Sequence, residues 1–224
     1  MVVLATKVYV SGDAKARALD SLGALVENQL RELSVSYEIG VRHDSFPSVT
    51  IDGDDAVVAR NLLRESWGEI VSDHTPETMY VGTLESWDET GIVLDAGTPI
   101  SIPADELGMG PGNPAQVIER FGLVQHMPIR FVVGGTSDLP SLADAERDRL
   151  YEWTRGDGRL NINSVTRGEV RATLNRAGHA QDYVTIERLG LLEQSVVCKA
   201  DTDPPGLLSS IGSYLPAEMR CVVT

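Results

Sequence analysis

The spacing of apolar side chains changes several times in the first seventy residues. The segment after residue 13 repeats Leu and Val every three or four positions, as a helix that buries one face does. Residues 35–42 then alternate strictly between apolar and polar, which predicts a half-exposed strand. The predicted elements are strands at 2–10, 35–42 and 46–52, helices at 14–33 and 56–67, and a short fourth strand at 70–71. The order βαββα predicts a ferredoxin-like unit over residues 1–73.

The pattern changes after His74 to short apolar runs separated by turns. The predicted elements are strands at 79–87, 91–96, 99–103 and 128–133, with a helix at 115–121. Closely spaced short strands with glycine turns indicate a small barrel. The run 82–103 resembles the opening of an S1-type OB barrel, although Ile92, Val93 and Leu94 occupy positions where such barrels usually carry aromatic residues. We therefore predict a small OB/S1-like β-barrel over residues 76–135, followed by a linker at 134–138.

The last part of the chain begins with a helix that we expect Ser141 to cap, with Asp144 completing a near capping box, and that runs to about Trp153. The elements predicted after it are strand 159–164, helix 167–177, strands 182–189 and 192–199, helix 205–215 and strand 218–223. This is a complete βαββαβ order. We predict a helix plus a ferredoxin-like unit over residues 140–224. The fold class is then α+β, with two ferredoxin-like βαββαβ units flanking a small OB/S1-like β-barrel.

Charge adds information about the environment rather than the chemistry. The chain carries 33 acidic residues against 19 basic ones, a net charge of −14, and its only lysines are Lys7, Lys15 and Lys199. A surface poor in Lys and rich in Asp suits a cytosol with molar salt, where the Debye length is about 3 Å and the repulsion within the chain is screened. The start of the chain lacks the features of a signal peptide, and no apolar run is long enough to span a membrane. We expect a cytoplasmic protein of an extreme halophile that has no membrane partner.

Residue types that usually carry catalysis or bind metals are sparse and scattered. The four histidines fall in four different predicted loops, and none has the spacing of a metal ligand. The acidic run 52–55 could attract a cation, but an Asp before a helix more often acts as an N-cap. Cys198 and Cys221 are expected on strands that do not neighbour each other, so both should be free thiols. The sequence thus predicts no catalytic residue, no metal site and no cofactor.

The arginines are unevenly distributed. Residues 71–138 contain two arginines against ten acidic residues, whereas residues 155–176 contain five arginines against two acids. The five are Arg155, Arg159, Arg167, Arg171 and Arg176. On the predicted helix, Arg167 and Arg171 lie opposite the apolar Val170 and Leu174, so they share one exposed face. Such a face suits contacts with phosphate groups, and its alternative is a solvated surface with salt-bridged arginines.

The turn before the last predicted helix suggests a second kind of site. The run 203–211 resembles the strand–turn–helix opening of ACT-type domains, in which an Asp-x-Pro-Gly turn approaches a small effector such as an amino acid. Asp203 and Gly206 would be the ligand-binding residues. The chain ends one strand later, so this order would need a partner subunit or a permuted sheet. The simpler interpretation is a proline in the first turn of a helix.

Four longer stretches resemble the archaeal domain-of-unknown-function family 2110. They are residues 40–49, 59–70, 119–126 and 187–193. Because these stretches are scattered over nearly the whole length, the resemblance applies to the chain as a unit. It implies an archaeal source, in agreement with the charge pattern, and it implies no activity and no catalytic residues.

The sequence leaves three functions open. The first is a non-enzymatic binding factor for RNA or a ribonucleoprotein complex of transcription or translation, supported by the predicted fold types and the arginines. Against it, the expected central strands 159–164 and 192–199 carry no aromatic residue on which RNA bases could stack. The second is an ACT-like regulatory protein that binds a small ligand, and the third is a protein–protein adaptor. The sequence does not predict an oligomeric state.

Overall fold

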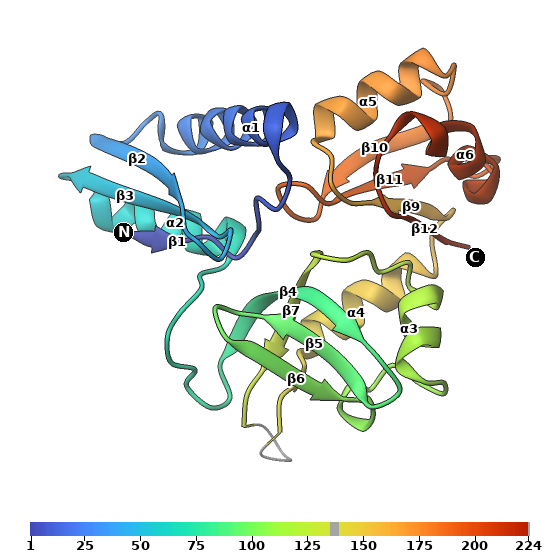
Figure 1. Cartoon of the computed structure of the whole chain (residues 1–224), viewed down its shortest axis with the longest axis horizontal. Coiled ribbons are helices and arrows are strands. Elements are labelled where there is room, and N and C mark those ends of the chain that lie inside the picture. Colours follow the sequence, from blue (N-terminus) through green and yellow to red (C-terminus); the bar gives the residue numbers. More distant parts are fainter. Residues whose placement is uncertain (135–138, 224) are drawn as a thin grey trace.

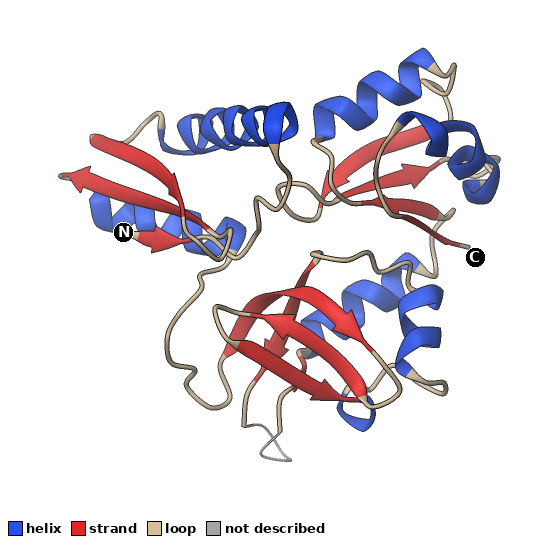
Figure 2. Ribbon diagram, viewed as in Figure 1, coloured by secondary structure: helices blue, strands red, loops and turns tan. Residues whose placement is uncertain are grey.

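The computed structural model describes residues 1–134 and 139–223, so the expected linker lies, apart from Gly134, outside the described residues. The described chain is a mixed α+β protein with three antiparallel sheets (Figures 1 and 2). The amino-terminal and carboxyl-terminal sheets lie side by side, and the central sheet lies beneath both in this view. Connecting segments, among them the one that follows β1 (Val2–Val3), lie between the three sheets in the middle of this view.

The amino-terminal sheet has the strand order β1-β3-β2. Its elements are β1 (Val2–Val3), α1 (Gly12–Leu30), β2 (Val35–Val41), β3 (Pro47–Gly53) and α2 (Ala56–Trp67). Both helices cover one face, since Leu22 and Val26 of α1 and Leu63 of α2 join Val49 and Ile51 in one buried cluster. The expected fourth strand is reduced to a single bridge between Leu4 and Glu69.

The predicted first strand over 2–10 is wrong in its second half. The backbone leaves the sheet after Leu4 and runs between the three units (Figure 1). The reason lies in its side chains, because Thr6 and Tyr9 bind the carboxyl-terminal unit while Lys7 binds the central one. These contacts with the other two units take the place of further pairing with β3.

The central sheet is curled and has the order β6-β5-β4-β7-β8. Its elements are β4 (Met79–Trp87), β5 (Gly91–Asp95), β6 (Pro99–Pro103), α3 (Pro114–Arg120), β7 (Pro128–Val132), β8 (Ser141–Leu142) and α4 (Asp144–Trp153). The outermost strands β6 and β8 approach each other, so the sheet curls around its core as a half-barrel. Leu84, Leu94 and Phe131 fill that core together with Ile118 of α3.

Helix α4 belongs to this core and begins later than predicted. Ser141 pairs with Val132 as part of β8, and the N-cap position is Ala143, which makes no side-chain cap. Leu150 and Trp153 are buried in the core of the central sheet. The sequence pattern grouped this helix with the carboxyl-terminal unit, from residue 140 onward. Periodicity located the buried face of the helix, but it contained no information on which sheet that face covers.

The carboxyl-terminal sheet has the order β10-β11-β9-β12. Its elements are β9 (Arg159–Ile162), α5 (Arg167–Arg176), β10 (Tyr183–Arg188), β11 (Gln194–Cys198), α6 (Pro204–Ile211) and β12 (Met219–Val222). One face packs on the two helices through an apolar cluster that includes Leu160, Val170 and Leu207. The other face is polar, and its Asn161 and Asn163 donate hydrogen bonds to carbonyls of the central unit. The helices and the central unit together therefore cover both faces of this sheet.

The cysteine prediction is confirmed. Strand β9 lies between β11, which holds Cys198, and β12, which holds Cys221, and both thiols are free. Burial raises the pKa of each thiol to about 11, so both stay protonated at neutral pH. Among the described residues, no helix is long and apolar enough to cross a membrane.

Candidate nucleic-acid interface

The three units border a groove made of three adjoining hollows of about 360, 460 and 590 Å³. Leu189, in the turn after β10, lines all three hollows. Trp67, at the end of α2, lines both the first and the second, and Arg188 lines both the first and the third. We call these three hollows together the junction groove.

Arginine dominates the charged lining of the junction groove. Its charged residues are six arginines (Arg64, Arg130, Arg149, Arg159, Arg167 and Arg188) and four glutamates (Glu65, Glu69, Glu152 and Glu187). The lining is thus positive in a chain of net charge −14. The first hollow contains no carboxylate in its lining, and Arg188 is its only charged residue.

Four of these arginines are held by carboxylates. Arg64 Nε lies 2.6 Å from Glu69 Oε2, and Arg159 pairs with Glu187. Arg130 and Arg149 share Glu146, whose side chain is fully buried. A buried carboxylate between two guanidinium groups fixes both, because an unpaired charge in that position would cost several kcal/mol. These pairs stiffen the walls of the groove.

Arg167 and Arg188 differ from the other four arginines. Neither has a carboxylate within salt-bridge distance in the described part of the chain. Burial lowers the pKa of Arg188, and the positive charge of Arg167 lowers it further. Arg167 Nε is buried and has no hydrogen-bond partner among the described residues. Two neighbouring guanidinium groups without a counterion form a site that favours an anion.

Two tryptophans add aromatic surface to the groove. The guanidinium carbon of Arg188 lies 5.8 Å from the ring centre of Trp67. Trp153 is buried, and it is contacted by Arg149 at 5.1 Å and Arg159 at 5.3 Å. Trp67 is only half-buried and lines two hollows, so it is the ring that a ligand can reach.

Local structure fixes the two unpaired arginines. Arg167 is the first residue of α5, directly after a capping box in which Thr166 and Glu169 bind each other's backbone amides. Arg188 ends β10, and the tight turn after it brings Gly190 close to the buried carboxylate of Glu193. A Cβ on Gly190 would lie 2.1 Å from Glu193 Oε2 and 3.0 Å from the Pro128 ring, so a larger residue there would displace the buried carboxylate.

Buried polar contacts of the amino-terminal segment hold the junction together. Lys7 Nζ lies 2.8 Å from Glu85 Oε1 and 2.6 Å from Asp95 Oδ2. Burial alone would raise the pKa of Glu85, but hydrogen bonds from His126 and Lys7 outweigh it and lower the pKa to about 2. This ion pair joins the first unit to the central sheet.

Tyr9 makes the corresponding link to the carboxyl-terminal unit. Its hydroxyl donates to Glu193 Oε1 at 2.7 Å and accepts from the amide of Ser164 at 2.9 Å, while its ring packs against the tilted ring of His126. Burial raises the pKa of Tyr9 and raises that of the fully buried Glu193 to about 8. The segment 5–10 therefore connects all three units beside the groove.

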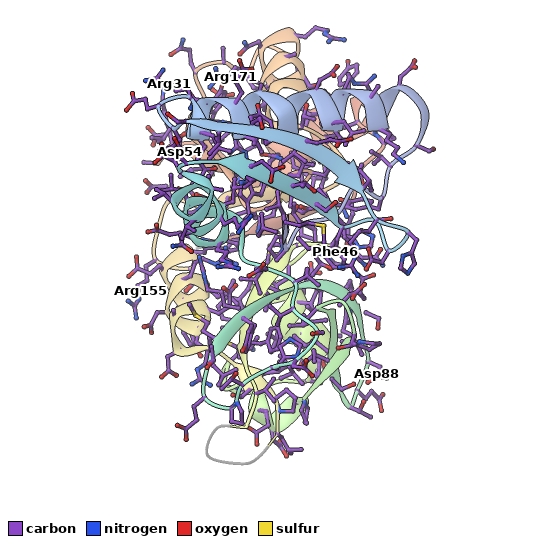
Figure 3. All side chains as sticks on the ribbon, turned by 90° about the vertical axis from the view of Figure 1, so that its left-hand side faces the viewer. Arg31, Phe46, Asp54, Asp88, Arg155 and Arg171 are labelled. Atoms are coloured by element: carbon purple, nitrogen blue, oxygen red, sulfur yellow. The ribbon has the colours of Figure 1, made fainter. Side chains whose placement is uncertain are left out.

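The five arginines expected from the sequence do not form one face. Arg159 and Arg167 both line the third hollow, whereas Arg155 follows α4 and lies away from α5. Figure 3 shows Arg171 near the top of the molecule and Arg155 well below it. Arg171 and Arg176 are exposed on α5. The sequence missed Arg149 and Arg188 as lining residues, because only the fold brings α4 and β10 together.

One acidic residue in each of the turns 52–55 and 203–206 accepts a hydrogen bond from a backbone amide of the protein itself. Asp203 Oδ2 accepts from the amide of Gly206 at 2.9 Å and so caps α6. Asp55 occupies the N-cap position of α2, but it accepts from the amide of Ser34 instead of capping the helix. No group of three potential metal ligands gathers among the described residues.

His179 forms a hydrogen-bonded chain that resembles a catalytic triad. Its Nδ1 lies 2.6 Å from Asp182 Oδ2, and its Nε2 lies 2.6 Å from Ser210 Oγ. Hydrolases with such a chain also need amide donors for the oxyanion. Ser210 lies inside α6, where helix geometry directs its amide to the carbonyl of Gly206. We therefore interpret these two hydrogen bonds as a structural link between α6 and the turn before β10.

Comparison with known families covers nearly the whole sequence. Residues 1–73 match the DUF2110 N-terminal domain, residues 74–154 the DUF2110 central domain and residues 157–223 the DUF2110 C-terminal domain. No curated protein and no solved structure matches the chain. The central match ends one residue after α4, in line with the packing of that helix on the central sheet. The chain belongs to the DUF2110 family.

Proposed function

We propose that this protein is a non-enzymatic binding factor for RNA or a ribonucleoprotein complex, and that RNA binds in the junction groove. The observation that carries the proposal is the pair Arg167 and Arg188, which both line the third hollow and have no carboxylate within salt-bridge distance among the described residues. The chain has a net charge of −14, and the other four arginines of the groove are each paired with a glutamate. The absence of a carboxylate partner therefore distinguishes these two arginines. A phosphate group would supply the missing counterion.

The chemistry of the pair also suits high salt. Guanidinium groups grip phosphate oxygens bidentately, whereas lysine acts as a point charge. Salt weakens every phosphate contact through counterion release, so geometry must contribute more of the affinity. The lining of the junction groove contains six arginines and no lysine, so its cationic side chains are all of the type that makes such bidentate contacts.

The fold favours the junction groove as the RNA site over the faces that ferredoxin-like and OB-like domains usually use. The order β10-β11-β9-β12 supports a ferredoxin-like assignment, and five curled strands with α3 between β6 and β7 support an OB-like one. The open sheet face of a ferredoxin-like RNA binder is here covered by the central unit, through Asn161 and Asn163. The hollow over β5 and β6, where OB folds bind, is lined by Asp88 and by no arginine.

The test compares two double variants by fluorescence anisotropy with labelled RNA. Arg167→Gln with Arg188→Gln should weaken binding about tenfold or more, because charged hydrogen bonds to phosphate are lost. Arg171→Gln with Arg176→Gln removes the same charge from the exposed face of α5 and should leave binding nearly unchanged.

Equal losses in the two variants would show non-specific attraction of RNA to positive charge and would contradict binding in the groove. An absence of RNA binding by the unmodified protein at near-physiological salt would overturn the proposal altogether. The adaptor and the small-ligand functions would then be the better explanations, and amino acids would be the next ligands to test.

A further inference from the structure

We propose that the junction groove binds single-stranded rather than duplex nucleic acid, with one unpaired base in the first hollow against Trp67 and its phosphate between Arg167 and Arg188. This inference rests on the proposed function and specifies the ligand of the same site. It follows from the chemical difference between the first and third hollows.

The first hollow has the composition of a base-binding pocket. Its lining combines the half-buried ring of Trp67 with apolar atoms from Leu25, Pro128 and Leu189, and it holds no carboxylate. A volume of about 360 Å³ lies within the range of small-molecule pockets. Aromatic rings bind unpaired bases by stacking, which tolerates any sequence.

The polar groups of the first hollow suit the edge of a base. Gln29 Nε2 is already engaged by the Leu62 carbonyl and by Ser66 Oγ, so its orientation is fixed. The Asn28 side chain makes no hydrogen bond to the described residues. An amide has two donors and an acceptor, the groups that base edges recognise.

Arg188 connects this pocket to the phosphate site. It lines the first hollow and the third, and its guanidinium lies over Trp67. Arg167 lines the third hollow as well, and its positive charge adds to burial in lowering the pKa of Arg188. A nucleotide with its base in the first hollow would therefore place its phosphate at this pair.

A duplex cannot satisfy both sites. Its bases are paired and stacked inside the helix, so only phosphates would reach the groove and the first hollow would stay unused. A single strand can turn a base out at little cost. Stacking in the first hollow should thus make the protein prefer single strands.

The experiment measures binding of one RNA sequence as a single strand and as a duplex, by anisotropy at constant KCl. We expect the single strand to bind at least tenfold more tightly. Trp67→Leu should reduce single-strand binding about tenfold and leave duplex binding unchanged. Trp87→Leu is the matched control, because Trp87 is also half-buried beneath an arginine, Arg220 at 5.5 Å, but lies outside the groove.

The outcomes separate this inference from the proposed function. Equal affinity for both RNAs, or an unchanged affinity in Trp67→Leu, would overturn the single-strand inference while leaving an RNA-binding groove in place. If the Arg167 and Arg188 double variant bound the single strand and the duplex as tightly as the unmodified protein does, both the single-strand inference and the proposed function would be overturned. If Trp67→Leu loses its far-ultraviolet circular dichroism signal, Asn28→Ala replaces it, with a smaller expected loss of about threefold to tenfold, because one hydrogen bond to a base is lost.

Discussion

Glu193 shows how a single buried side chain can make the stability of the whole junction depend on pH. Its carboxyl group is fully buried, accepts from Tyr9 and leaves Oε2 without a partner among the described residues. Burial raises its pKa to about 8 from an ordinary value of 4.5. The folded state therefore keeps a proton on Glu193 over a range in which the unfolded chain has lost it.

The expected result is a loss of stability toward alkaline pH. Between pH 4.5 and 8 the folded state binds one proton more than the unfolded state, so the free energy of unfolding falls as pH rises, by a few kcal/mol at most. Glu193→Gln should remove this fall and should be more stable than the unmodified protein above pH 8. Chemical denaturation at fixed KCl from pH 5 to 8.5 measures it, with the exposed Glu89→Gln as the control. A fall of the same size in Glu193→Gln would show that another group titrates.

Sequence reasoning could not find Glu193 or its neighbours. Lys7, Tyr9, Glu85 and Glu193 are separated by up to 186 positions in the sequence, and nothing in their local spacing links them. The same applies to Arg149 and Arg188 of the groove, which lie on different units. Arg159 and Arg167 are the two predicted arginines that line the groove, and they are close in sequence as well as in space.

At the level of elements, local patterns predicted most helices and strands within a few residues. The alternation of apolar and polar residues over 35–42 predicts β2, and the apolar face that contains Val170 and Leu174 predicts α5. The errors occurred where an element serves another unit, as in the segment after Leu4 and in α4. Periodicity reports that a face is buried, whereas the partner of that face depends on contacts between distant segments.

One observed cap, Thr166, and one cap expected from the sequence alone, Ser141, lead to a matched prediction. Thr166 caps α5 through Glu169, and its loss should cost about 1 kcal/mol in the free energy of unfolding. Ser141, which the sequence predicts as a cap, lies in β8 and caps nothing, so Ser141→Ala should change stability by less than about 0.5 kcal/mol. Urea denaturation of Thr166→Ala and Ser141→Ala measures both values. A larger cost for Ser141→Ala would support the sequence prediction over the structure.

The whole molecule combines a strongly negative surface with one positive groove, and salt should act on the two in opposite ways. Because 33 acidic residues repel one another in a chain of net charge −14, screening should stabilise the fold. The melting temperature should therefore rise steeply between low and molar KCl, as expected for a halophilic protein. Sucrose, which favours compact states without screening charge, should not reproduce the rise. A melting temperature independent of KCl would contradict the halophile interpretation.

Binding in the junction groove should respond to the same salt in the opposite direction. Each phosphate contact to a single strand releases counterions, so the logarithm of the binding constant should fall with the logarithm of KCl by about 0.7 per contact. The Arg167 and Arg188 double variant loses one phosphate contact and should therefore show a slope smaller by about 0.7, whereas the Arg171 and Arg176 control should keep the original slope. The part of the affinity that comes from stacking on Trp67 does not depend on counterions, so it should persist at salt concentrations where phosphate contacts have weakened. Binding that disappears completely at molar KCl would show that phosphate contacts alone hold the ligand, and that the first hollow contributes nothing.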